Sequence, residues 1–233
     1  MKKENAVNFL LFGYFGITLE NSKDDIISAA INRAYRDAAS HVLSLKDDSK
    51  KDTEKGKKLF ADASELIKKF IEEVLTNGAQ NEYNEKHHVL CEKLTSKYSN
   101  SANSGYEFSY GVAQKWVNMT MKYLSVILTI FSEYKNTHVF VNTYKNSFQA
   151  IEHSLHVPID GYILEYVSNK KYSNVEPIDI AKKENKNNLA WSKYEKDDYQ
   201  KLQISIKEMY INEPTFPLDW ENEAWIKVAK SKK

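Results

Sequence analysis

The sequence predicts an all-α protein, and two observations carry this prediction. Apolar residues recur at helical spacing through nearly the whole 233-residue chain. Serine, aspartate, proline and glycine stand between the apolar stretches, where helices start and stop. No linker is recognisable, so we expect one all-helical domain over residues 1–233, or two interleaved lobes with a cleft between them.

The N-terminal segment, residues 1–20, combines a basic start with a short apolar run. Gly13 and Gly16 interrupt this run, and no small-residue cleavage site follows it. We therefore interpret the segment as a first core helix and not as a signal peptide. No stretch approaches membrane-spanning length, so we expect no membrane partner. The single cysteine, Cys91, leads us to expect an intracellular, cytoplasmic protein.

Three further helices are predicted in the first half of the chain. Ser22 is placed to cap the first of them. A connector rich in lysine and aspartate, residues 46–58, leads to a helix over 59–75, which an Asn-Gly pair at 77–78 stops. A less apolar helix follows over residues 80–98.

A polar turn then opens onto a strongly apolar helix, residues 111–133. Its composition indicates burial, yet Lys115 and Lys122 lie inside it. Lysine rarely enters a core without a partner or a function, so these two positions raise the main question of the sequence. The next stretch, residues 137–144, fits either a short strand or a loop.

The last third is predicted to consist of short helices, each with its own start signal. Pro158 lies just before one of them. The residue before a proline disfavours helical geometry, so this helix is expected to start after the proline. The expected starts are Phe148, Asp160, Pro177, Ser192 as a cap and Asp219 as a cap.

Composition excludes several classes of protein. The chain has 42% hydrophobic and 28% charged residues and a formal net charge of +1, so its bulk charge argues neither for nor against a nucleic-acid partner. Cys91 is the only cysteine, which excludes an internal disulfide, a cysteine-rich metal site and an iron–sulfur centre. The only arginines, Arg33 and Arg36, share one helix face.

Two short segments resemble the helix-hairpin-helix DNA glycosylases. Residues 111–115, "GVAQK", match the end of that family's glycine hairpin, after which a buried helix carries the catalytic lysine. Residues 156–160, "HVPID", match the segment in which the catalytic aspartate starts a later helix. Ala113 replaces the second hairpin glycine, and Tyr110 stands at the usual proline. The interval between the segments is long and is closer to that of the archaeal 8-oxoguanine glycosylases.

The resemblance implies a helical DNA-glycosylase-like fold with a helix-hairpin-helix element, acting as a monomer on double-stranded DNA. Lys115 would be the nucleophile or an electrostatic stabiliser at the sugar, since a desolvated lysine has a lowered pKa. Asp160 would accept a proton and stabilise positive charge on the deoxyribose as the base leaves. No cofactor or metal is implied. Two substrates remain open: a lesion such as oxidised guanine, or a modified base in phage DNA.

The same resemblance suggests which residues contact DNA. The backbone N–H groups of Gly111, Val112 and Ala113 would bind a phosphate, with Arg33 and Arg36 as further phosphate contacts. An extruded base needs a pocket with aromatic walls. The candidates for that pocket are Gln114, Trp116, Asn118, His156, Trp191, Tyr199 and Trp220.

Each of these residues also has an ordinary structural explanation. Lys115 fits a surface lysine whose stem lies on apolar neighbours, and Asp160 fits a plain helix cap. Gln114 and Asn118, four residues apart on one face, would then satisfy buried carbonyls, and His156 would be structural. In the closing segment, residues 217–225, the two tryptophans favour core packing, and the carboxylates fit a pocket rim without metal-ligand spacing.

Two other classes of function compete with the glycosylase. Residues 36–41, "RDAASH", resemble the Arg-polar-x-x-x-His motif of HEPN ribonucleases, which are all-helical and cleave RNA without a metal across a dimer. A non-enzymatic helical adaptor also fits the even charge. Lys115 and Asp160 in one cleft would favour the glycosylase, whereas Arg36 and His41 at a two-fold interface would favour the ribonuclease.

Overall fold

The computed structural model describes residues 1–39, 53–76, 82–99, 108–172, 190–212 and 214–232. Over these ranges the chain forms nine α-helices and no strand, which confirms the all-α prediction. The helices are α1 (Lys3–Phe15), α2 (Lys23–Ala39), α3 (Glu54–Thr76), α4 (Tyr83–Tyr98), α5 (Tyr110–Tyr134), α6 (Val139–Ile151), α7 (Gly161–Ser168), α8 (Lys196–Tyr210) and α9 (Pro217–Ser231), with 3₁₀ turns η4 (Glu152–Ser154) and η6 (Trp191–Lys193). No helix of these ranges combines the length and apolar character needed to cross a membrane.

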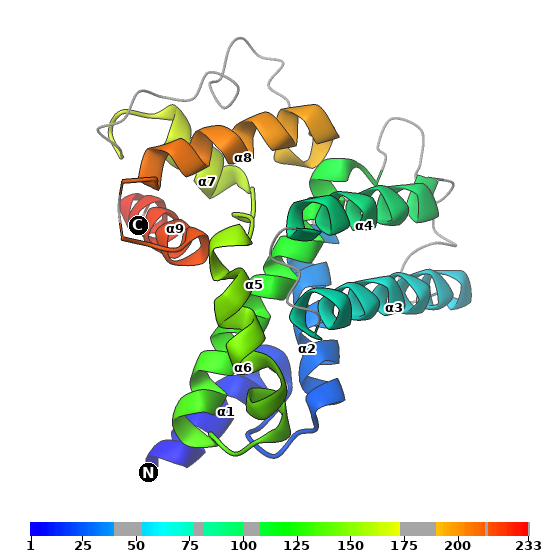
Figure 1. Cartoon of the computed structure of the whole chain (residues 1–233), viewed down its shortest axis with the longest axis vertical. Helices are drawn as coiled ribbons and strands as arrows, with labels where there is room; N and C mark the ends of the chain where they lie inside the picture. Colours follow the sequence, from blue (N-terminus) through cyan, green and yellow to red (C-terminus); the bar gives the residue numbers. More distant parts are fainter. Residues whose placement is uncertain (40–52, 77–81, 100–107, 173–189, 213, 233) are drawn as a thin grey trace.

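Helix α5 is the centre of the fold (Figure 1). Helix α2 packs along it, α3 and α4 lie on one side, and α7, α8 and α9 lie on the other. Helices α1 and α6 lie at the end that holds the N-terminus. Because neighbours surround α5, it buries residues around most of its circumference, as the apolar content of residues 111–133 predicts.

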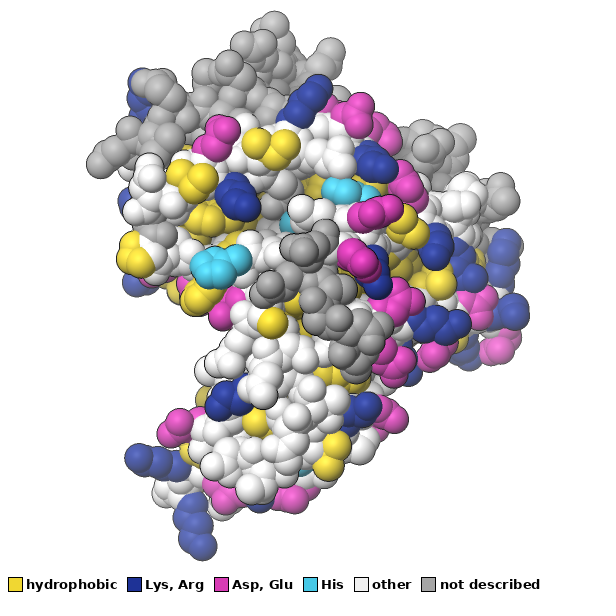
Figure 2. Space-filling view, viewed as in Figure 1, with side chains coloured by type: hydrophobic (Ala, Val, Ile, Leu, Met, Phe, Trp, Pro, Cys, Tyr) yellow, Lys and Arg dark blue, Asp and Glu magenta, His cyan; other side chains and the backbone are white. Residues whose placement is uncertain are grey.

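Charged side chains of both signs are interspersed over α3 and α4 on the face shown in Figure 2. Several of them are paired, such as Lys97 with Asp62 at 3.0 Å. Mixed charge of this kind supports solubility but gives no single-sign field for steering a charged partner.

The first turn of α5 is held from two directions. The Ser109 hydroxyl accepts the Val112 N–H at 3.2 Å, which is an ordinary N-cap. The Gly111 N–H donates to the Tyr194 carbonyl at 2.8 Å, which docks the residues that follow η6 onto the helix. A Cβ atom at position 111 would lie 2.1 Å from the Trp191 carbonyl oxygen. Glycine is required there because another backbone segment touches the helix.

Residues 137–144 contain no strand, and most of them are helical. Helix α6 begins at Val139, and the His138 side chain accepts the Phe140 N–H at 3.1 Å. The imidazole supplies the cap that serine, threonine, aspartate or asparagine usually provides. The choice between strand and loop is therefore wrong, and the predicted helix from Phe148 is the end of α6.

Predicted helix caps are confirmed at two positions and wrong at two. Ser22 and Asp160 accept backbone N–H groups at the starts of α2 and α7. Ser192 lies in η6, and α8 begins after it without a side-chain cap. Pro217 takes the first position of α9, where its fixed φ suits a helix start, so Asp219 falls inside the first turn.

Helix α3 begins at Glu54, inside the predicted connector. The Thr53 hydroxyl accepts the Gly56 N–H at 3.0 Å and starts the helix early. The stop predicted at residues 77–78 and the helix predicted from Pro177 lie outside the described residues.

Helix α1 forms as predicted but is not a core helix. Leu11 is its one fully buried side chain in the described structure. The large apolar side chains on its other side are exposed, by 74% at Phe9, 67% at Leu10 and 65% at Phe12. Apolar content alone predicts burial, but here the helix lies at an end of the molecule with neighbours on one side only.

A chain of hydrogen bonds crosses the interior between α4, α5 and α8. His87 donates through Nε2 to Asn118 Oδ1 at 2.8 Å, and Asn118 donates to the Tyr199 hydroxyl at 2.9 Å. Tyr199 donates to His156 Nδ1 at 2.7 Å, and His156 donates through Nε2 to Asn84 Oδ1 at 2.8 Å. The polar side chains of this chain of hydrogen bonds thus satisfy one another, and a buried polar group left without a partner would destabilise the fold.

The close approach at Gly111 gives a stability prediction. Gly111→Ala should lower the free energy of unfolding by about 1–3 kcal/mol, because the new Cβ must displace backbone rather than a flexible side chain. Gly161→Ala is the matched control, since nothing lies within 4 Å of a Cβ there. Urea unfolding measures the free energy of unfolding of both variants. A Gly111→Ala protein as stable as Gly161→Ala would contradict the packing described.

The buried histidines give a pH prediction. Burial lowers the pKa of His87 to about 3, so His87 stays neutral when folded but takes a proton when unfolded below about pH 6.5. Stability is therefore full above pH 6.5 and falls towards pH 3, by about 1.4 kcal/mol per pH unit for this one group. Urea unfolding at pH 7.5 and 5.5 measures the loss. His87→Gln keeps a donor without a titrating ring and should reduce the slope; an unchanged slope would refute the assignment.

Candidate active site

Lys115 and Asp160, predicted from two separate motifs, meet in the structure. Lys115 lies in the first turns of α5, and Asp160 lies at the start of α7. The distance from Lys115 Nζ to Asp160 Oδ2 is 3.8 Å, and the side chains are 8% and 17% exposed. The pair is therefore largely withdrawn from water without being sealed from it.

Asp160 is held by the start of its own helix. Its Oδ1 atom accepts the N–H groups of Tyr162 at 2.9 Å and Ile163 at 3.0 Å. The cap fixes the carboxylate, and the positive end of the helix dipole favours its negative charge. The other oxygen, Oδ2, faces Lys115 and accepts the indole N–H of Trp225 at 3.2 Å.

Burial and three nearby carboxylates act in opposite directions on the Lys115 amine. Burial lowers the pKa of Lys115 below its ordinary value, although the neighbouring carboxylates of Asp160, Asp37 and Glu221 oppose the shift. Its Nζ atom lies 4.3 Å from the centre of the Trp191 ring. A lowered pKa increases the fraction of neutral amine at a given pH, and the neutral amine is the nucleophilic form.

Lys122, the second lysine of the buried helix α5, also has a carboxylate partner. It lies seven residues after Lys115, on the same face of the helix, and forms a hydrogen-bonded ion pair with Glu221 of α9. Glu221 is almost fully buried, and burial raises its pKa against the opposing effect of Lys122. Both lysines in the buried helix thus have a carboxylate supplied by another helix.

Side chains from two helices hold the segment that leads to Asp160. Gln203 of α8 accepts the Val157 N–H at 3.1 Å and donates to the Val157 carbonyl at 2.6 Å. Gln114 and Asn118 of α5 donate to the carbonyls of Ile159 and Val157, each at 3.4 Å. These amides replace the backbone partners that a helix would supply. Gln114 and Asn118 therefore satisfy buried carbonyls, and the structure does not place them in a base pocket.

The other predicted pocket residues divide between the interior and the site. His156 and Tyr199 belong to the internal hydrogen-bond chain. Trp116 is fully buried and donates through Nε1 to the Ile31 carbonyl at 3.1 Å. Trp220 is buried against the rings of Tyr166 and Tyr210. Among the seven candidates, Trp191 alone has a described contact with the Lys115 amine.

Trp225 and Tyr162 are the neighbours of the pair that sequence reasoning missed. Trp225 was assigned to core packing, but it is 36% exposed and bonds Asp160. Its ring lies 4.8 Å from the ring of Tyr162, centre to centre. The sequence held a clue for Tyr162 only: it follows Asp160 by two residues and therefore had to lie near the carboxylate.

The predicted hairpin at Gly111, Val112 and Ala113 is the first turn of α5. The Gly111 N–H is bonded to Tyr194, the Val112 N–H to the Ser109 hydroxyl, and the Ala113 N–H to the Ser109 carbonyl at 3.1 Å. All three donors are therefore occupied within the protein, and none of them is free to bind a phosphate in this conformation.

The two arginines have different surroundings. Arg33 pairs with Asp37 at 3.3 Å, and its guanidinium lies 4.1 Å from the centre of the Tyr14 ring. Arg36 is exposed on α2. Its partner in the ribonuclease motif, His41, lies outside the described residues, so the structure gives that motif no geometry.

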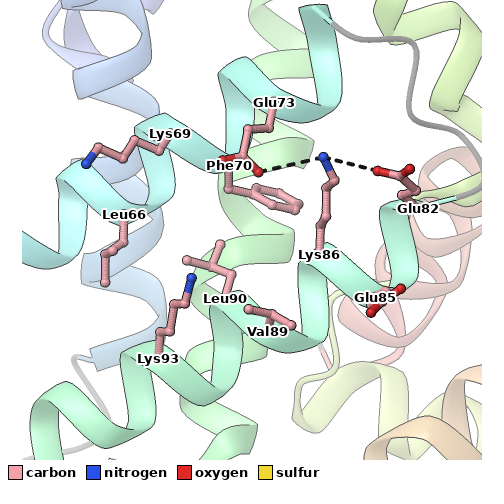
Figure 3. Close-up of a pocket in the computed structure, with 10 residues that line it drawn as sticks. All are labelled: Leu66, Lys69, Phe70, Glu73, Glu82, Glu85, Lys86, Val89, Leu90 and Lys93. Carbon is pink, nitrogen blue, oxygen red and sulfur yellow. Dashed lines mark ion pairs between the residues drawn. The ribbon is translucent and has the colours of Figure 1, made fainter.

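A groove of about 310 Å³ lies between α3 and α4, away from Lys115 and Asp160 (Figure 3). Its floor is apolar, and Lys86 bridges Glu73 at 3.7 Å and Glu82 at 3.2 Å across one end. These three charges are paired and partly exposed, so each pair contributes little to stability. The lining residues are Leu66, Lys69, Phe70, Glu73, Glu82, Glu85, Lys86, Val89, Leu90 and Lys93.

Across the described part of the chain, no three histidine, cysteine, aspartate or glutamate side chains are arranged to hold a metal ion. Comparison of the chain with protein-family models, with curated proteins and with solved structures finds no match. The chemistry of the Lys115–Asp160 pair is therefore inferred from its own geometry.

A double-mutant cycle tests whether the pair interacts. Asp160→Asn keeps a cap oxygen but leaves the Lys115 charge without its nearest counterion, and should lower the free energy of unfolding by about 1–3 kcal/mol. Lys115→Met in the same protein should restore part of this loss, with a coupling energy of about 0.5–2 kcal/mol.

The exposed pair Lys196–Glu92, 2.7 Å apart, is the control for this cycle. Its coupling energy should stay below about 1 kcal/mol, because water screens both charges. Additive effects at Lys115 and Asp160 in urea unfolding would show that the 3.8 Å contact carries no energy.

Proposed function

We propose that this protein is a DNA glycosylase in which Lys115 and Asp160 act on the bond between sugar and base of an extruded nucleotide. The observation that carries the proposal is the partly desolvated Lys115 amine, 3.8 Å from a carboxylate that caps a helix. Two segments that separately resemble the lysine and aspartate motifs of one glycosylase family are thus in contact.

The chemistry needs only these two groups. As the C1′–N bond breaks, its electron pair leaves with the base, and positive charge develops on the deoxyribose. The Asp160 carboxylate stabilises that charge, and its interaction is strong because little water surrounds it. The neutral Lys115 amine then bonds to C1′, and the proton that it must lose passes to Asp160 or to solvent.

A hydrolytic course uses the same residues differently. Asp160 removes a proton from water, the hydroxide bonds to C1′, and Lys115 remains charged as an electrostatic stabiliser. The lysine course forms a Schiff base after the sugar ring opens and allows strand cleavage, whereas the hydrolytic course leaves an abasic site. Borohydride reduces a Schiff base to a stable adduct, so it distinguishes the two.

A base-release assay tests the proposal. Purified protein is incubated with duplexes that carry 8-oxoguanine, uracil, alkylated purines or glucosylated hydroxymethylcytosine, and alkali then reveals abasic sites. We expect release from one of these duplexes, which names the substrate as a lesion or as a modified base of foreign DNA. Asp160→Asn should lower the rate at least about 100-fold, because charge stabilisation at the sugar is lost.

Lys115→Gln should abolish strand cleavage and borohydride trapping if the amine is the nucleophile. Glu223→Gln and Lys201→Gln, exposed changes on α9 and α8, are the matched controls and should retain full activity. Full base release by Asp160→Asn would contradict the proposal. Intact duplexes together with a degraded RNA control would point instead to Arg36 and His41.

A further inference from the structure

Each oxygen of the Asp160 carboxylate has its own kind of donor. Oδ1 is occupied by two backbone N–H groups of α7. Oδ2 accepts the Trp225 indole N–H at 3.2 Å, which is its one hydrogen bond among the described residues. Oδ2 therefore faces the indole N–H on one side and the Lys115 amine on the other.

The Lys115 amine is near Oδ2 but is not hydrogen-bonded to it. Their separation of 3.8 Å exceeds the usual 2.7–3.2 Å of a nitrogen–oxygen hydrogen bond. Lys122 and Glu221, in comparable surroundings, do form a direct hydrogen bond. The Lys115–Asp160 pair, which has the longer separation, is also the pair whose oxygen accepts a hydrogen bond from the Trp225 indole.

Trp225 is held beside this oxygen by its neighbours and is also partly exposed. One side of the indole packs on Tyr162, at 4.8 Å between ring centres, and Tyr162 belongs to the helix that Asp160 caps. The side chain is still 36% exposed, so part of it faces solvent beside the pair. The other tryptophan of the site, Trp191, lies over the amine.

We infer that Trp225 is a positioning residue, whose indole N–H holds Asp160 Oδ2 and prevents it from forming a direct hydrogen bond with Lys115. This inference rests on the proposed function and extends it. Without the indole donor, Oδ2 would turn to the lysine and form a tight ion pair. A tight pair favours the ammonium form, so the neutral amine needed for attack would become rarer.

Three carboxylates near Lys115 affect the protonation of its amine and therefore the dependence of activity on pH. Asp160 comes from α7, Asp37 from α2 and Glu221 from α9, and all three favour the charged amine against burial. Asp37 is itself paired with Arg33, and Glu221 with Lys122. Trp225→Phe changes none of these charges and removes only the donor, so a shift in the pH profile reports the Lys115–Asp160 separation.

The contact itself is tested without any activity. The chain has four tryptophans, so a protein labelled with ¹⁵N-tryptophan gives four indole N–H signals in an NMR spectrum. Trp225→Phe identifies the signal of residue 225. In Asp160→Asn the amide oxygen must serve the helix cap, so the amide nitrogen faces the indole and the hydrogen bond is lost. We expect the Trp225 signal to move and the Trp220 signal to stay; an unmoved Trp225 signal overturns the inference.

The role is tested by the rate of base release against pH. Trp225→Phe should lower kcat at neutral pH about 10-fold and move the rise of activity to higher pH, while KM changes less than about 3-fold. Ile226→Val, an exposed change at the next position of the same helix, is the control and should keep the wild-type profile. An unchanged profile in Trp225→Phe, with an active wild type, overturns this inference alone. An inactive wild type overturns the proposed function, and the NMR experiment still decides the contact.

Discussion

The withdrawal of two lysine side chains from water is the constraint on which this fold depends. Helix α5 is covered on most sides, and the side chains of Lys115 and Lys122 are only 8% and 16% exposed. A buried ammonium group is strongly destabilising without a counterion. Helices α7 and α9 supply the two carboxylates, Asp160 and Glu221. The packing of α7 and α9 against each other and beside α5 is therefore tied to the charges as well as to apolar contact.

Polar side chains of the interior hold the non-helical segment before Asp160 in place. The residues just before Asp160 belong to no helix, so their backbone groups need partners from elsewhere. Gln203, Gln114 and Asn118 provide these partners. Asn118 also joins the hydrogen-bond chain through His87 and Tyr199. A change in α4 or α8 is thus coupled to the position of the aspartate through fixed hydrogen bonds.

Local sequence signals predicted much of the helical framework, and the resemblance of two segments to one glycosylase family predicted that Lys115 and Asp160 lie together. Neither predicted the neighbours of that pair. The caps at Ser22 and Asp160 and the burial of α5 depend on residues close in sequence, which is why they could be predicted. The role of Gly111 depends on the Trp191 carbonyl, 80 residues later, so a glycine that resembled a hairpin proved to be a packing requirement. The exposure of Trp225 was equally unpredictable, because an aromatic residue on an amphipathic helix usually faces the core.

The contrast between the two lysine–carboxylate pairs supports the proposal that Lys115 reacts, whereas Lys122 has a structural role. Both lie on one face of one helix, and both have a carboxylate from another element. Lys122 and Glu221 are hydrogen-bonded, and Glu221 is almost completely covered, so this pair has the geometry of a stable internal contact. Lys115 keeps a separation of 3.8 Å from an oxygen that already has another donor, and a tryptophan ring lies over the amine. Lys115 is therefore desolvated without a direct hydrogen bond to its carboxylate, which is the arrangement that the proposed reaction requires.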